Sequence, residues 1–143
     1  DFGGVITTSP FEAFARFEAE RGLPADFIRR VNATNPDVNA WARFERAEID
    51  QGGFDRMFAA EAAAQGYSVR GADVLPLLSG SLRPRMVAAL DAVTQRYRTG
   101  CITNTVPTGH GAGMSTSAVS AASVAAVLAR FDHVIESSRV GIR

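Results

Sequence analysis

The sequence predicts an α/β fold in which a small parallel sheet is interrupted by an inserted bundle of helices. Between Pro10 and about Gly66, apolar residues recur at helical spacing in one segment after another. Later in the chain, two short apolar segments at 100–105 and 132–138 flank a helical segment rich in small residues. A strand, a helix and a second strand in this order are typical of parallel pairing.

The inserted bundle begins with the clearest helix signal of the chain. In "SPFEAFARFEAERG", Ser9 is a capping residue, Pro10 suits the first helical position, and Glu12 completes an S-x-x-E capping box. Gly22 is expected to end this helix. Segments 24–34, 38–49 and 54–66 repeat the apolar periodicity and predict a small antiparallel bundle, with Trp41 and Phe44 inside it.

The remaining residues predict a second structural unit. Residues 71–86 read as a turn-rich joint, followed by a helix, the strand "GCITNT", a glycine-rich loop at 106–117, another helix and the strand "DHVIESS". We therefore expect residues 1–9 and 83–143 to form an α/β core, and residues 10–82 to form a helical insertion above the strand ends.

Composition excludes several classes of function. The 143 residues suit one domain, and 15 basic residues, all of them arginine, balance 15 acidic residues, so neither nucleic acid nor an anionic membrane is an expected partner. Cys101 is the only cysteine, which rules out an internal disulfide, and we expect it to be a buried apolar residue. The absence of an apolar run of membrane-spanning length and of a signal-peptide pattern favours a cytoplasmic protein.

The opening "DFGGVITTSP" raises the question of chemistry. If one strand ends at Asp1 and the next at Thr103, both side chains lie at the carboxyl edge of the sheet, where open α/β folds bind ligands. A carboxylate there can attack phosphorus and form an aspartyl-phosphate, with Thr103 and Asn104 as donors to the phosphoryl oxygens. A divalent cation, facing the Gly3 carbonyl, would offset the repulsion between the two anions. The alternative is that Asp1 is merely solvated.

Three motifs together carry a family resemblance. "DFGGV", "CITNT" and "VIESSRVG", with a helical insertion after the first, resemble the haloacid dehalogenase superfamily, most closely the group similar to the N-terminal phosphatase-like domain of soluble epoxide hydrolases. The resemblance implies a Rossmann-like core with a mobile helical cap. It also implies that Asp1 is the nucleophile and a Mg²⁺ ligand with Gly3, that Thr103 binds phosphate beside Asn104, and that the substrate is a small phosphate ester.

The sequence also departs from the pattern of these phosphatases. Gly3 stands where they carry a second aspartate, the general acid and base. The third-motif lysine and the acidic fourth motif are expected beyond Arg143, so we interpret the chain as part of a longer protein, inactive and poorly stable alone.

Two alternatives remain open: a dehalogenase-type hydrolase with the same nucleophile, and a non-catalytic binding or regulatory domain. Substrate identity and oligomeric state are left open, and no role is expected for His110 in its loop or for His133 before the second strand.

Overall fold

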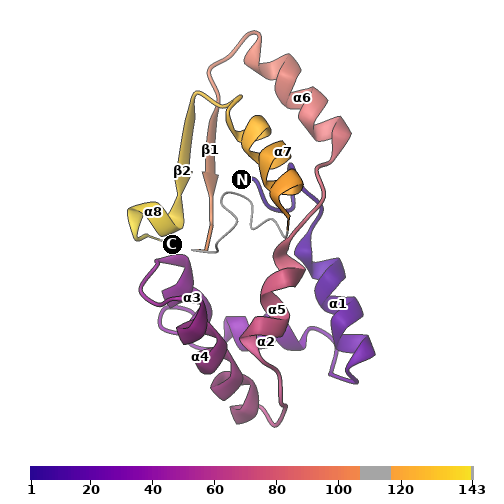
Figure 1. The fold of residues 1–143 in the computed structure, drawn as a ribbon, viewed down its shortest axis with the longest axis vertical. Coiled ribbons are helices and arrows are strands. Elements are labelled where there is room, and N and C mark those ends of the chain that lie inside the picture. Colours follow the sequence, from indigo (N-terminus) through magenta and orange to yellow (C-terminus); the bar gives the residue numbers. More distant parts are fainter. Residues whose placement is uncertain (107–116, 143) are drawn as a thin grey trace.

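A computed structural model describes residues 1–106 and 117–142 as a mixed α/β structure that is mostly helical (Figure 1). The elements are α1 (Pro10–Glu20), α2 (Phe27–Ala33), α3 (Ala40–Glu45), α4 (Gln51–Ala64), α5 (Gly71–Val74), the 3₁₀-helix η1 (Leu75–Leu78), α6 (Pro84–Thr94), β1 (Gly100–Thr103), α7 (Ala118–Leu128), β2 (His133–Glu136) and α8 (Ser137–Val140). The α/β class and the parallel sheet are confirmed. The finer description, a Rossmann-like core with a cap, stays a prediction, and the predicted loop around His110 lies outside the described residues.

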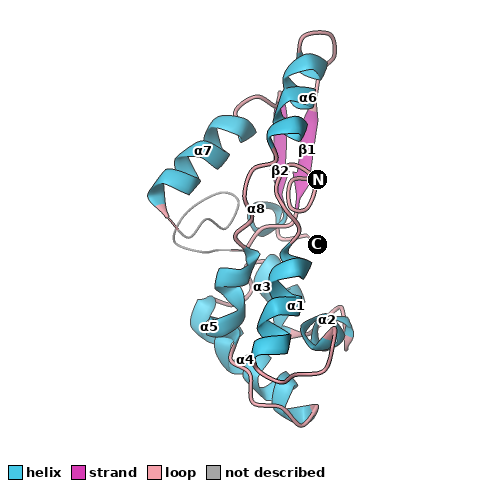
Figure 2. Cartoon of the chain, turned by 90° about the vertical axis from the view of Figure 1, so that its right-hand side faces the viewer, coloured by secondary structure: helices cyan, strands magenta, loops and turns pink. Residues whose placement is uncertain are grey.

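The sheet of the described residues consists of β1 and β2, which pair in parallel from Gly100 opposite His133 to Thr103 opposite Glu136. Cys101 is 1% exposed and packs with residues of α6 and α7, whereas the next residue, Ile102, is 71% exposed on the other face. Both strands point toward the helices α1–α5, which lie beyond their carboxyl ends (Figures 1 and 2). The strand order and direction follow the prediction from the sequence.

Two separate hydrophobic clusters hold the chain together. The first is aromatic and lies among α1–α5 and η1; its fully buried large side chains are Phe27, Ile28, Val31, Phe44, Phe54, Phe58 and Val74. The second lies against the sheet and consists of Phe2, Ile6, Leu90, Cys101, Val124, Val127 and Leu128. Val106, just after β1, belongs to the first cluster, so the segment that leaves the strand end joins the two parts.

The chain crosses between the two parts through a pair of adjacent segments. Thr7 forms an isolated antiparallel bridge with Leu82, and the Thr8 N–H donates to the Ser81 carbonyl at 2.9 Å. The Ser81 N–H donates in return to the Thr8 hydroxyl at 3.1 Å. The outgoing and returning segments are thus hydrogen-bonded to each other, which limits how the helical part sits over the strand ends.

Helix α1 forms as its sequence signals predict. Ser9 Oγ accepts a hydrogen bond from the Phe11 N–H, Pro10 is the first helical residue, and Gly22 has the left-handed φ of 64° that ends such helices. The aromatic side chains predicted inside the bundle lie there: Phe44 stacks on Phe54 with ring centroids 4.8 Å apart, and Trp41 meets the same ring edge-on.

Residues 71–78 differ from the expected turn-rich joint, because they form α5 and η1. The cause is a long-range contact: the Asp55 carboxylate, on α4, accepts the Ala72 N–H at 2.8 Å and caps the N-terminus of α5. The same carboxylate pairs with Arg70 at 2.6 Å, and this hydrogen bond lowers the pKa of Asp55.

Two more carboxylates cap helices in the same way. Glu18, buried on α1, accepts the N–H groups of Asp26 and Ile28, each at 2.9 Å, at the start of α2. Glu61, on α4, accepts the Ala40 N–H at 2.8 Å at the start of α3, and its burial raises its pKa. Helices that are short and weak by themselves are therefore held by side chains of their neighbours.

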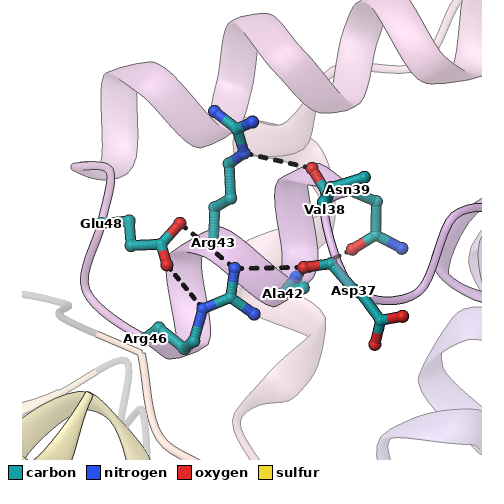
Figure 3. A network of polar contacts seen from close by, with 7 residues as sticks. All are labelled: Asp37, Val38, Asn39, Ala42, Arg43, Arg46 and Glu48. Atoms are coloured by element: carbon teal, nitrogen blue, oxygen red, sulfur yellow. Dashed lines mark hydrogen bonds and ion pairs between the residues drawn. The ribbon is translucent and has the colours of Figure 1, made fainter. Parts of the chain in front are cut away.

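Helix α3 is also secured by polar contacts around it (Figure 3). Asn39 caps it by accepting the Ala42 N–H at 2.8 Å, and the Arg43 guanidinium donates to the Val38 carbonyl at 3.1 Å. Arg46 contacts both Glu48 oxygens and the Asp37 carbonyl, and its hydrogen bond lowers the pKa of Glu48. The loop before α3 and the turn after it are thus tied to the helix, which contacts α8 at the strand ends.

Candidate functional site

The carboxyl edge of the sheet contains a small cavity of about 30 Å³. Its polar lining comes from both strand ends and from the opening segment, and includes Gly3, Thr103, Asn104 and Glu136. Its apolar lining includes Leu78 of η1, so helices and sheet meet at this point. Since about 10–15 Å³ is enough for one water molecule, the cavity in this conformation has the size of one or two waters.

Thr103 and Asn104 lie where the sequence predicts them, at the end of β1. Thr103 is 7% exposed, and among the described residues its hydroxyl makes a single, long contact of 3.5 Å to the Asn104 carbonyl. Because the pairing is parallel and in register, Glu136 lies beside Thr103 at the end of β2. A hydroxyl, an amide side chain and a carboxylate therefore share one edge.

A hydroxyl clamp holds this edge together. Ser137 Oγ accepts the Thr105 N–H at 2.9 Å and donates to the Thr105 carbonyl at 3.2 Å. The hydroxyls of Thr105 and Ser138 are 2.6 Å apart. The backbone beyond β1 is thus fixed against the start of α8, and the adjacent residues Thr103 and Asn104 are held on a rigid frame.

The Asp1 side chain is not brought to this cavity. Asp1 lines a different hollow of about 320 Å³, together with Thr99 and Gly100 at the amino end of β1, and its carboxylate accepts the Phe2 N–H at 2.7 Å. Gly3, two residues later, lines the cavity with Thr103. The opening turn therefore lines both hollows, and it places Gly3 rather than the Asp1 carboxylate in the cavity with Thr103.

The two glycines after Phe2 differ in backbone conformation and surroundings. Gly4 has a φ of 79°, which few other residues adopt readily, so it allows the turn that follows. A Cβ at Gly3 would meet nothing within 4 Å. Glycine at position 4 thus serves the turn, whereas a Cβ at position 3 would lie in open space.

The predicted magnesium ligands do not form a metal site in this arrangement. The Asp1 carboxylate and the residue Gly3 line different hollows. Within residues 1–106 and 117–142, no three His, Cys, Asp or Glu side chains gather as a metal site requires. Any magnesium site would need ligands from outside the described residues together with a different orientation of Asp1.

Glu136 is the residue of this edge that sequence reasoning missed as a candidate. Its side chain is 12% exposed, and its Oε2 pairs with Arg139 Nε at 2.7 Å. The signal was present, since Glu136 ends the second strand just as Thr103 ends the first. Elsewhere, Cys101 is buried as expected, and burial raises the pKa of its thiol, while His133 is the first residue of β2.

A comparison with protein-family models finds no match for this chain, and a comparison with curated proteins finds no similar sequence. The family resemblance therefore rests on the three motifs and their order. Among the described residues, every helix is too short or too polar to cross a bilayer.

Proposed function

We propose that this chain is the nucleophile-bearing part of a hydrolase similar to the haloacid dehalogenase superfamily, and that its Asp1 forms an aspartyl-phosphate during hydrolysis of a small phosphate ester. One observation supports this most strongly. Two parallel strands end side by side, Thr103 in register with Glu136, and Gly3, two residues after the candidate nucleophile, lies at the same edge. Carboxyl edges of parallel sheets are where α/β proteins bind ligands.

The proposal assigns each residue a task. Asp1 attacks phosphorus through a carboxylate oxygen, and the leaving oxygen departs with the electron pair of its bond to phosphorus and takes a proton from water to become the alcohol. Thr103 and Asn104 donate hydrogen bonds to the phosphoryl oxygens, on the frame fixed by Ser137. The Asp1 carboxylate must turn from the hollow at Gly100 to the cavity beside Gly3, and the cavity must widen to admit the phosphoryl group.

The proposal also requires residues that this sequence lacks. It contains no lysine, so the lysine of the third motif and the acidic residues of the fourth motif must lie outside residues 1–143. The divalent cation, Mg²⁺ by resemblance, requires the same acidic residues. The candidate is thus a property of the longer protein, and residues 1–143 alone are proposed to be inactive.

Gly3 favours a second candidate, a dehalogenase-type hydrolase. A halide leaves without a proton, so such an enzyme does not need the general acid that position 3 supplies in the phosphatases. A third candidate, a binding or regulatory domain with a degenerate site, rests on the same glycine.

Two assays on the protein that contains this chain separate these candidates. Release of phosphate from a panel of phosphate esters with Mg²⁺, abolished by Asp1→Asn, supports the phosphatase; release of halide from haloacids, abolished by the same change, supports the dehalogenase. Gly3→Asp is a further variant, since a Cβ at position 3 meets no atom within 4 Å. A large gain in phosphate release indicates a phosphatase that lacks its acid, and absence of both activities in every variant leaves the binding domain.

A further inference from the structure

We propose that Glu136 is the general base of this site, which activates the water that hydrolyses the aspartyl-phosphate formed at Asp1. This inference rests on the proposed function and adds to it a catalytic residue on the second strand. Because Gly3 replaces the usual second acid, another group must accept the proton of the attacking water, and Glu136 is proposed for this task.

The position of Glu136 is the first argument. The parallel register puts it directly beside Thr103, the proposed phosphate-binding residue, and both line the cavity at the strand ends. Its carboxylate is 12% exposed, so it is largely withdrawn from bulk solvent. A carboxylate next to the reacting group and shielded from bulk water is the usual setting of a general base.

The ion pair of Glu136 is the second argument. Arg139 Nε lies 2.7 Å from Oε2, so a positive charge anchors one oxygen of the carboxylate. Within the part of the chain that the structure describes, this pair is the one polar contact recorded for the Glu136 side chain, which leaves Oε1 to accept a proton.

The size and lining of the cavity are the third argument. Its volume of about 30 Å³ suits one or two waters, and it offers the polar partners that a held water needs: Glu136, the Thr103 hydroxyl and Asn104. Phe2 and Leu128 supply apolar walls. A water held there is restrained by the groups that would orient it for attack.

The water oxygen attacks the phosphorus of the aspartyl-phosphate while Glu136 takes one proton from that water. The bond between phosphorus and the Asp1 oxygen breaks, and its electron pair returns to the Asp1 carboxylate. Inorganic phosphate is released, and Glu136 then loses its proton to solvent. In the dehalogenase alternative, the same base would activate water to attack the carbonyl carbon of an Asp1 alkyl ester.

The test uses Glu136→Gln in the protein that contains this chain, assayed with a chromogenic phosphate ester and Mg²⁺. If Glu136 acts in the second step, the variant releases about one equivalent of alcohol in a burst, then turns over 10²–10⁴-fold more slowly. Mass spectrometry should find the phosphate on Asp1. Hydroxylamine, which attacks the acyl carbon of an aspartyl-phosphate, should release the phosphate and leave Asp1 as its hydroxamate, a second mass signature of the adduct. A purely structural role for Glu136 would produce neither the phosphate adduct nor the hydroxamate.

Three controls make the outcome decisive. Glu12→Gln changes an exposed glutamate of α1 and should leave all phases unchanged. Glu136→Asp keeps the charge, guards against misfolding of the glutamine variant, and should show a smaller accumulation of adduct. If the unsubstituted protein turns over and Glu136→Gln turns over equally fast, the base assignment is overturned while the proposed function stands. If the unsubstituted protein forms no covalent adduct at Asp1, the proposed function itself fails.

Discussion

Ser137 Oγ satisfies both main-chain polar groups of Thr105, accepting its N–H at 2.9 Å and donating to its carbonyl at 3.2 Å. This relationship joins residues 32 positions apart at the carboxyl ends of the two strands. A single hydroxyl thus replaces the ladder hydrogen bonds that β1 and β2 would make if they continued. The geometry of the candidate site depends on it.

Ser137→Ala should therefore destabilise the protein by about 1–3 kcal/mol, because it leaves the buried Thr105 N–H without its acceptor. Urea unfolding followed by circular dichroism measures the change. The matched control is Ser123→Ala on the exposed face of α7, where the hydroxyl bonds the Val119 carbonyl of its own helix. Equal and small effects of the two substitutions would show that the clamp contributes little.

Glu18→Ala should cost about 2–3 kcal/mol of unfolding free energy, since the Asp26 and Ile28 N–H groups at the start of α2 lose a charged acceptor. Glu18→Gln retains one carbonyl oxygen and should cost less. Glu20→Ala, an exposed change on the same helix, is the control. Hydrogen exchange should accelerate at Ile28 in the alanine variant; unchanged protection there would argue against capping.

Gly71→Ala should destabilise the protein by about 1–3 kcal/mol through overpacking, because the added Cβ would lie 2.8 Å from Asp55 Cα and 2.9 Å from the Phe54 ring. Gly52→Ala offers the opposite case within α4, where the nearest atoms are 3.5 Å away or more. It should stabilise the helix by up to about 1 kcal/mol. Thermal melts of both variants measure the contrast, and a neutral Gly71→Ala would mean that α4 and α5 separate easily.

Glu61 should make stability fall as pH rises. Burial raises its pKa in the folded state, so its contribution to stability is fully present below the ordinary glutamate pKa of about 4.3 and is lost as pH rises through the raised value. Glu61→Gln keeps an acceptor for the Ala40 N–H but cannot ionise. The difference in unfolding free energy between the variant and the unsubstituted protein should grow in the variant's favour from pH 4 upward. A difference that is constant with pH would contradict this.

Local signals in the sequence predicted much of the fold. The Ser9 cap, Pro10 and Gly22 bound α1 as expected, and the apolar segments around Cys101 and Val134 pair in parallel. These features depend on residues within one element or on a well-known connection rule, so a sequence contains them.

Long-range contacts could not be predicted from these local sequence patterns. Helix α5 forms where a joint was expected because Asp55, 17 residues earlier, accepts the Ala72 N–H. The start of α2 has a left-handed residue, Asp26, and no cap from its own side chain, and Glu18 replaces that cap from α1. These partners are set by packing, and no local pattern shows them.

The candidate site was predicted in part. Thr103 and Asn104 lie at the strand end as expected. Asp1, in contrast, lines the hollow beside Gly100, and Glu136 lies at the same edge as Thr103 although the sequence analysis did not name it as a candidate. The motif "DFGGV" specifies a turn, and Gly4 supplies its positive φ, but the side-chain direction of the residue before it depends on what surrounds the opening segment.

The central claim is that Asp1 attacks the substrate, and the most direct measurement is the site of covalent modification. The protein that contains this chain, incubated with a phosphate ester and Mg²⁺ and quenched in acid, should carry phosphate on the peptide that contains Asp1. The Asp1→Asn variant should carry none. Turnover of the ester without any adduct at Asp1, or an adduct on another residue, would contradict the account.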